Sequence, residues 1–182
     1  KLSYCLREFA LLKNKTEVDP QLSPQERFVA KIKKMGVTDP KILEKLRELY
    51  IDIHASVFLY SDTLSVLQIL KTQGKKLCLI TNTDAYAHQK MMKLLGEDLF
   101  SLILASHEVG LRKPDINLFK KVETHFRVDP SQILMVGDSE DFDILPAKQL
   151  GWKTCLIDRE NKIQTSVADI VVSSLEELSK KV

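Results

Sequence analysis

Residues 77–96, LCLITNTDAYAHQKMMKLLG, decide the fold of this chain. A continuous apolar run stops at the polar segment 81–84, and apolar residues at helical spacing follow directly. A short apolar run that ends in small polar residues before an amphipathic helix is typical of a strand–helix unit in a parallel sheet. The polar residues are favoured helix caps. They also suit an anion site at a helix N-terminus, and the rest of the chain decides between these two interpretations.

The same alternation of strand and helix continues on both sides of this stretch. Alternation at this spacing indicates a parallel sheet with helices on both faces. The expected strands are continuous apolar runs, which is typical of strands covered on both faces. We therefore predict an α/β fold, a Rossmann-like three-layer core over residues 58–182. Helices are expected at 62–74, 84–96, 115–126, 142–151 and 175–182, and strands at 76–81, 99–106, 132–138, 153–158 and 169–174.

Residues 1–57 have a different pattern of apolar residues, because their spacing predicts helices only. The expected helices cover 3–14, 23–36 and 39–58. Ser23 and Asp39 are predicted N-caps, and each precedes a proline, which is favoured in the first turn of a helix. We expect a small all-helical domain at 1–57 beside the α/β domain at 58–182.

Composition excludes several classes of protein. The net charge is +2 and the charged residues are 29% of the chain, which gives no electrostatic footprint for nucleic acid or membrane binding. Cys78 and Cys155 lie in apolar runs and are expected in the core, as suits a reducing cytoplasm. The four histidines show no ligand spacing and are predicted to be helix or loop residues. A monomer and a homodimer are both left open.

Polar residues follow three of the expected strands, and in an open parallel sheet ligands bind at these carboxyl ends. Thr81 and Asn82 follow the first strand, Lys113 lies beyond the second, and Asp138 and Asp143 follow the third. Hydroxyl and amide donors, an ammonium group and a carboxylate pair suit a phosphate ester together with Mg²⁺. Each signal alone is weak, since capping residues, loop lysines and acidic turns are common.

Together, in this order, the motifs LITNTD (79–84), VGLRKPD (109–115) and ILMVGDSEDFDI (133–144) resemble those of the haloacid dehalogenase superfamily, in particular its phosphatase-like branch with a helical cap. The resemblance runs from about residue 58 to 172. It implies a Mg²⁺-dependent phosphomonoester hydrolase acting on a small phosphorylated metabolite. By resemblance, Thr81, Asn82 and Lys113 hold the phosphoryl group, Thr81 and Lys113 being catalytic. Asp138 and Asp143 hold the metal, and residues 1–57 form the cap.

One motif of that family is missing from the sequence. The family's first motif is a strand ending Asp-x-Asp, whose first Asp is the nucleophile that forms an aspartyl-phosphate. The nearest imitation, Asp52 to Ser56, lies within a segment of helical spacing, so we reject it. In the family the missing strand lies at the centre of the sheet, where its loss leaves backbone groups unpaired.

The sequence begins with Lys1 rather than Met, and we expect that an N-terminal segment was left off, cleaved, or supplied by another chain. The nucleophile is therefore unknown, and the printed chain alone is expected to be inactive. A non-catalytic binding protein that has lost its nucleophile is the alternative. A 2-haloacid dehalogenase is a more distant one, because the sequence Gly137-Asp138-Ser139 favours phosphoryl chemistry.

Overall fold

The structure is a computed structural model of the 182-residue chain, and it describes residues 24–55 and 57–182. The chain divides into two compact units. The first contains the described residues up to 57 together with 85–87, and the second contains 58–84 and 88–182. The helix predicted at 3–14 and the N-cap predicted at Ser23 lie outside the described residues.

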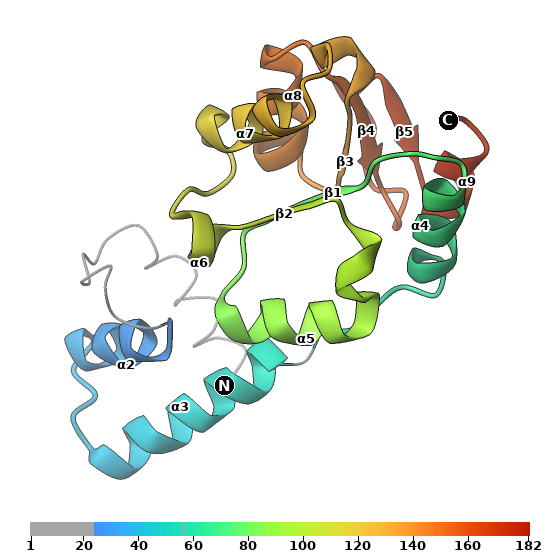
Figure 1. Cartoon of the computed structure of the whole chain (residues 1–182). Coiled ribbons are helices and arrows are strands. Elements are labelled where there is room, and N and C mark those ends of the chain that lie inside the picture. The colour runs from blue at the N-terminus through green and yellow to red at the C-terminus, as the bar shows by residue number, and fades with distance from the viewer. Residues whose placement is uncertain (1–23, 56) are drawn as a thin grey trace. The chain divides into compact units, whose positions relative to one another are not determined.

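The first unit contains the helices α2 (Pro24–Lys34), drawn in blue in Figure 1, and α3 (Pro40–Ala55), drawn in cyan. Phe28 and Leu43 are buried between the helices, and the Phe28 ring lies 4.7 Å from the ring of Tyr50. The Asp39 side chain accepts a hydrogen bond of 2.8 Å from the Lys41 N–H, which confirms the predicted cap. Because α3 continues to Ala55, residues 52–55 of the rejected motif are helical, as the apolar spacing predicted.

The second unit alternates helices and strands, and no helix among the described residues is long and apolar enough to span a bilayer. Its strands are β1 (Cys78–Thr81), β2 (Leu102–Ala105), β3 (Leu134–Gly137), β4 (Lys153–Ile157) and β5 (Ile170–Val172). Its α-helices are α4 (Thr63–Thr72), residues 88–95 of α5 (Ala85–Leu95), α6 (Ser106–Val109), α7 (Ile116–Phe126), α8 (Leu145–Gln149) and α9 (Leu175–Ser179). It also contains the 3₁₀ turns η1 (Glu97–Leu99) and η2 (Pro130–Gln132) and the π-helical turn η3 (Glu140–Ile144).

All strand pairs are parallel, as predicted, but they form two sheets rather than one. β1 pairs with β2 from Cys78 beside Leu102 to Thr81 beside Ala105. β4 pairs with β3 on one side and β5 on the other. Among the described residues, no backbone ladder joins β1 to β3. Each of these two strands therefore has one edge that pairs with no strand in 24–55 or 57–182.

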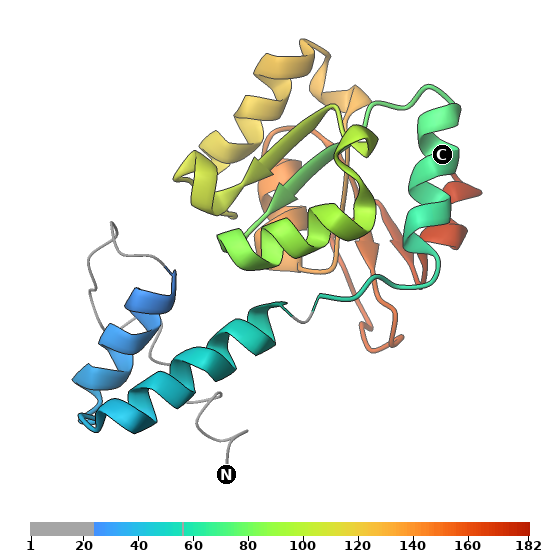
Figure 2. The same ribbon diagram turned by 60° about the horizontal axis from the view of Figure 1, so that its bottom comes forward.

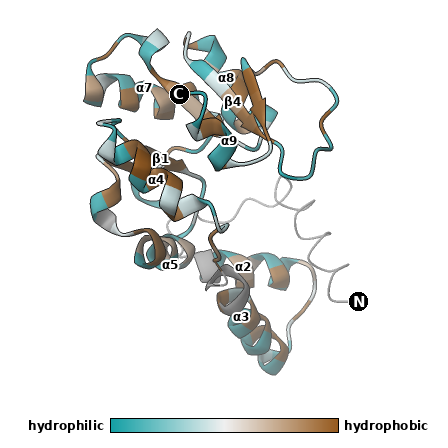
Figure 3. Ribbon diagram, turned by 90° about the vertical axis from the view of Figure 1, so that its right-hand side faces the viewer, coloured by the Kyte–Doolittle hydropathy of each residue, from teal (hydrophilic) through white to brown (hydrophobic). Residues whose placement is uncertain are grey.

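Helices cover both faces of the strands, which gives the three-layer arrangement (Figure 2). One core packs α7 and α8 against β1, β2 and β3, with Ile80, Leu104 and Met135 contributing from those strands. A second core packs α9 against the opposite face of β3, β4 and β5. The hydrophobic colouring is strong on β1 and β4 in Figure 3. Both sheets thus share one core beneath the same helices, although their backbones do not pair.

Two local features differ from the prediction. The short helix α6 occupies the segment expected to be a loop, and the helix expected at 142–151 is divided. The carbonyl of Ser139 accepts from the N–H groups of both Asp143 (3.0 Å) and Ile144 (3.2 Å). The hydrogen bond from Ile144 spans five residues, so η3 is a π-helical turn, and α8 begins after it. Pro146 in the first turn of α8 fits this boundary, since proline has no N–H to donate.

The two described cysteines are free thiols and lie in the core, as predicted. Burial raises the pKa of Cys78 to about 12. Burial also raises the pKa of Cys155, to about 11. Both thiols are therefore protonated at neutral pH, which makes them poor nucleophiles and poor metal ligands.

Candidate functional site

Lys113 connects the segments that follow β1 and β3. The lysine lies in the loop between α6 and α7, and its Nζ donates a hydrogen bond of 2.6 Å to Oδ1 of Asp143 in η3. Asn82, the residue after β1, contacts the backbone of the same lysine. Three side chains that are far apart in the sequence therefore meet at the carboxyl ends of the strands.

Asn82 holds Lys113 by a reciprocal pair of hydrogen bonds. Its Nδ2 donates to the Lys113 carbonyl at 2.9 Å, and its Oδ1 accepts from the Lys113 N–H at 2.8 Å. Both polar atoms of the amide are thus engaged by the backbone, which leaves one amide hydrogen for a ligand. The geometry gives Asn82 a positioning function for the lysine, which sequence analysis did not foresee.

Asp143 is held beneath the end of β3 by the lack of a side chain at Gly137. The aspartate is 1% exposed, and its Oδ2 accepts a hydrogen bond of 3.1 Å from the Ser139 N–H. A Cβ atom at Gly137 would lie 2.4 Å from the Asp143 carboxyl carbon, which is closer than real contacts allow. Only a glycine at this position therefore leaves room for the Asp143 carboxylate. The buried carboxylate is compensated by the Lys113 ammonium and the amide, as a buried charge requires.

Thr81 and Asp138 lie at the ends of the same strands but have free side chains. Thr81 is the last residue of β1 and is half-buried, whereas Asp138 directly follows β3 and is exposed. Neither side chain forms a hydrogen bond or ion pair with the described part of the chain. Both are therefore available to a ligand.

The donor set is of the kind that Mg²⁺ takes. Mg²⁺ binds oxygen ligands and is commonly held by one or two carboxylates, with water and substrate oxygens completing its shell. Asp138 offers an exposed carboxylate, and Asp143 offers a carboxylate fixed in place by Lys113 and Ser139. These two residues fit the ion that the sequence predicted.

A second reciprocal contact joins the loop after β1 to the start of α6. Ser106, a buried residue at the start of α6, accepts from the Thr83 N–H and donates to the Thr83 carbonyl, both at 3.1 Å. The loop after β1 is therefore fixed by Ser106 and the loop before α7 by Asn82. Pairs of this kind fix a site before any ligand arrives.

Comparison with known proteins identifies relatives along most of the chain. Residues 9–157 match the model of the family described as haloacid dehalogenase-like hydrolase. A glyceraldehyde 3-phosphate phosphatase from Methanocaldococcus jannaschii is 30% identical over 149 residues, which are 79% of this chain and 65% of that protein. A phosphoserine phosphatase from Thermus thermophilus is 32% identical over 123 residues, which are 66% of this chain and 49% of that protein.

A solved structure shares the fold. The crystal structure of a phosphatase from Thermococcus onnurineus has a TM-score of 0.66 and 29% identity, and the match covers 86% of this chain and 78% of that one. The chain spans between about half and two thirds of the length of the two curated relatives, 49% and 65%. Those proteins are therefore longer than the part of them that this chain matches.

Proposed function

The chain belongs to the haloacid dehalogenase-like hydrolase family, and from that membership we propose that it is a Mg²⁺-dependent hydrolase of phosphate monoesters that acts on a small phosphorylated metabolite. The observation that carries the proposal is the contact of Lys113 with both Asn82 and Asp143, because it joins three motifs at one edge of the strands. Both curated relatives are phosphatases, which supports the reaction class.

Each residue of the site has a distinct function in this proposal. The Thr81 hydroxyl and the remaining Asn82 amide hydrogen donate to phosphoryl oxygens. The Lys113 ammonium offsets the negative charge that gathers in the transition state. Asp138 and Asp143 would hold Mg²⁺, which supplies electrostatic stabilisation to the phosphoryl oxygens when bound. Because Lys113 is fixed at its backbone and at its Nζ, it needs little rearrangement to act.

The nucleophile in this proposal comes from outside the printed residues. A strand ending in Asp-x-Asp would lie between β1 and β3, where it would present its carboxylates beside Lys113 and Asp138. Two observations support this position. β1 and β3 each have an unpaired edge, and both contribute to the core beneath α7 and α8. A parallel strand inserted there would pair the backbone groups that are now unpaired.

The test is an assay of the encoded protein, including any residues encoded before Lys1, on an aryl phosphate with and without Mg²⁺. We expect turnover that requires Mg²⁺ and is almost abolished in Asp138→Asn. Asp141→Asn is the matched control, because Asp141 is an exposed aspartate in the same segment. Lys113→Met should lower kcat about 10²- to 10³-fold, as removal of a transition-state donor does elsewhere. Lys120→Met, at an exposed lysine of α7, should leave kcat unchanged.

Two results would contradict the proposal. Equal turnover by the wild type and Asp138→Asn would exclude the metal function of Asp138. No turnover of any phosphate ester by the complete encoded protein would favour the alternative, a non-catalytic binding protein. In that case Lys113→Met should weaken the binding of inorganic phosphate, which calorimetry can measure without catalysis.

A further inference from the structure

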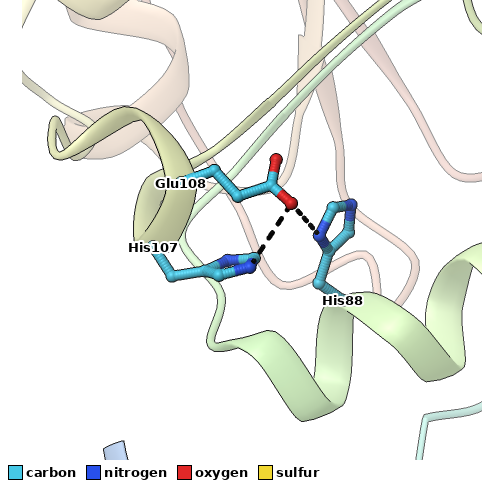
Figure 4. A group of neighbouring side chains, drawn as sticks. All are labelled: His88, His107 and Glu108. Atoms are coloured by element: carbon cyan, nitrogen blue, oxygen red, sulfur yellow. Dashed lines mark ion pairs between the residues drawn. The ribbon is translucent and has the colours of Figure 1, made fainter. Parts of the chain in front are cut away.

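Two histidines meet at one carboxylate in the second compact unit. His88 lies in α5, whereas His107 and Glu108 are neighbours in α6. The histidine rings form an edge-to-face pair with centroids 5.1 Å apart. Both rings face the same oxygen of Glu108 (Figure 4). The sequence showed no ligand spacing for these histidines, because the fold and not the local chain brings them together.

The distances within this group fit a bound ion better than direct hydrogen bonds. Nδ1 of His88 lies 3.4 Å from Oε1 of Glu108, and Nε2 of His107 lies 3.6 Å from the same oxygen. Good N–H···O hydrogen bonds measure about 2.7–3.2 Å. Two ligands that each lie about 2.1 Å from a tetrahedral ion are roughly 3.4 Å apart. One ligand atom from each of the three residues lies within 4.8 Å of the others, so a small adjustment closes the set around an ion.

Burial gives the group a closed side and an open side. The side chains of His88 and His107 are 12% and 18% exposed, whereas that of Glu108 is 55% exposed. An ion can therefore enter beside the glutamate. The remaining ring nitrogens, Nε2 of His88 and Nδ1 of His107, are buried and have no hydrogen-bond partner among the described residues.

Those two buried nitrogens set an upper limit on affinity. A histidine that binds a metal through one nitrogen carries its proton on the other, which usually donates to a neighbouring acceptor. Loss of such a partner typically weakens metal binding by about 10- to 100-fold. We therefore expect an ion at this group to be exchangeable rather than permanently bound.

We propose that His88, His107 and Glu108 bind one divalent transition-metal ion of the Zn²⁺ class, with solvent at the open coordination position. Two imidazoles and one carboxylate suit zinc, cobalt or nickel, whereas Mg²⁺ takes oxygen ligands. This group shares no residue with the carboxylates proposed to hold Mg²⁺. An ion here links α5 to α6, and the contact of Thr83 with Ser106 already joins the loop before α5 to the first residue of α6.

The test is a titration of the full chain with Co²⁺, which replaces Zn²⁺ and whose weak visible d–d absorption in water intensifies and shifts in a four-coordinate site. We expect one equivalent to bind and the melting temperature to rise with Co²⁺ concentration. His88→Gln and His107→Gln should each weaken Co²⁺ binding at least about 10-fold. His125→Gln is the matched control, because His125 is an exposed histidine of α7. A Cys5→Ser background removes a thiol that lies outside the described residues.

Two further arms separate this ion from the proposed Mg²⁺. The absorption should persist in a large excess of Mg²⁺ and in Asp138→Asn. Should a histidine variant fail to fold, Glu108→Gln replaces it, because its exposed side chain can lose the charge without disturbing the core. A Co²⁺ spectrum that stays that of the free aqueous ion, an affinity unchanged in the cluster variants, or loss of the intensified absorption in Asp138→Asn would each overturn the proposal.

Discussion

At the scale of single residues, the site depends on positions where a side chain is absent as much as on those where one is present. Gly137 lets the Asp143 carboxylate pack beneath the end of β3, and that carboxylate in turn accepts from Lys113. The motif order predicted the polar residues, because hydroxyl, ammonium and carboxylate groups after strands have recognisable chemistry. The clamp of Asn82 on the Lys113 backbone was not predictable, because it depends on how the two loops meet in space.

Gly137→Ala should therefore destabilise the protein by about 1–3 kcal/mol, the usual range for adding a methyl group to a full core. The added Cβ would lie 2.4 Å from the carboxyl group of Asp143, so that side chain must move away from Lys113. The measurement is urea unfolding followed by the fluorescence of Trp152, the chain's single tryptophan, which is buried.

The double variant Gly137→Ala with Asp143→Ala gives the control for this steric explanation. In the Asp143→Ala background the added methyl group meets no carboxylate. It should therefore lower the free energy of unfolding by less than it does in the wild type. Additive effects of the two changes would show that the methyl group strains some other contact.

At the scale of elements, alternation and apolar run length predicted the strands and most of the helices. The exceptions are α6 and η3, where the backbone follows particular hydrogen bonds rather than a periodic pattern. The predicted helix at 62–74 is also anchored in a way the sequence does not reveal. The Asp62 side chain accepts two hydrogen bonds from Arg159, at 2.9 and 3.1 Å, and one of 2.8 Å from the Leu175 N–H. One buried carboxylate thus ties the beginning of α4 to the loop after β4 and to the beginning of α9.

Asp62→Ala should lower the free energy of unfolding by about 3 kcal/mol, because it leaves a largely buried arginine without its partner. The Arg159 side chain is still 22% exposed. We therefore expect a loss of stability at the lower end of the range for breaking a buried pair. Glu44→Ala, in the exposed pair with Arg47, is the control and should change stability by less than about 1 kcal/mol. A similar loss in both variants would contradict the structural function of Asp62.

The same contact has a defined pH dependence. Burial alone raises the pKa of Asp62, but the hydrogen bonds from Arg159 and the Leu175 N–H outweigh it, so the pKa lies below the ordinary value of 3.8. A depressed carboxyl pKa stabilises the folded state above the ordinary value, and that contribution is lost as the pH falls through the depressed value. The difference in stability between wild type and Asp62→Ala should therefore be constant at neutral pH and shrink below about pH 4.

At the scale of the whole molecule, the sequence predicted parallel strands covered by helices on both faces, and the structure agrees. It also predicted that the middle strand of the sheet is missing from the printed residues. The two sheets that share one core are what such a gap would produce, because β1 and β3 contribute side chains to the same core without pairing. The sequence does not show which segment fills the gap. The motifs consist of side chains, whereas strands pair through backbone groups.

Hydrogen exchange tests this gap directly. β4 is paired on both sides, whereas β1 and β3 are each paired on one side only within the described part of the chain. Amide hydrogens on the unpaired edges have no backbone acceptor, so they should exchange with solvent far faster than those of β4, in which Cys155 is fully buried. Residue-resolved exchange measured by NMR on the printed chain gives the comparison.

If a strand carrying the nucleophile pairs with these edges in the complete encoded protein, the same β1 and β3 amides should become protected there while those of β4 change little. Protection of β1 and β3 equal to that of β4 in the printed chain would mean that the edges are already paired, and it would remove the structural support for a strand between them.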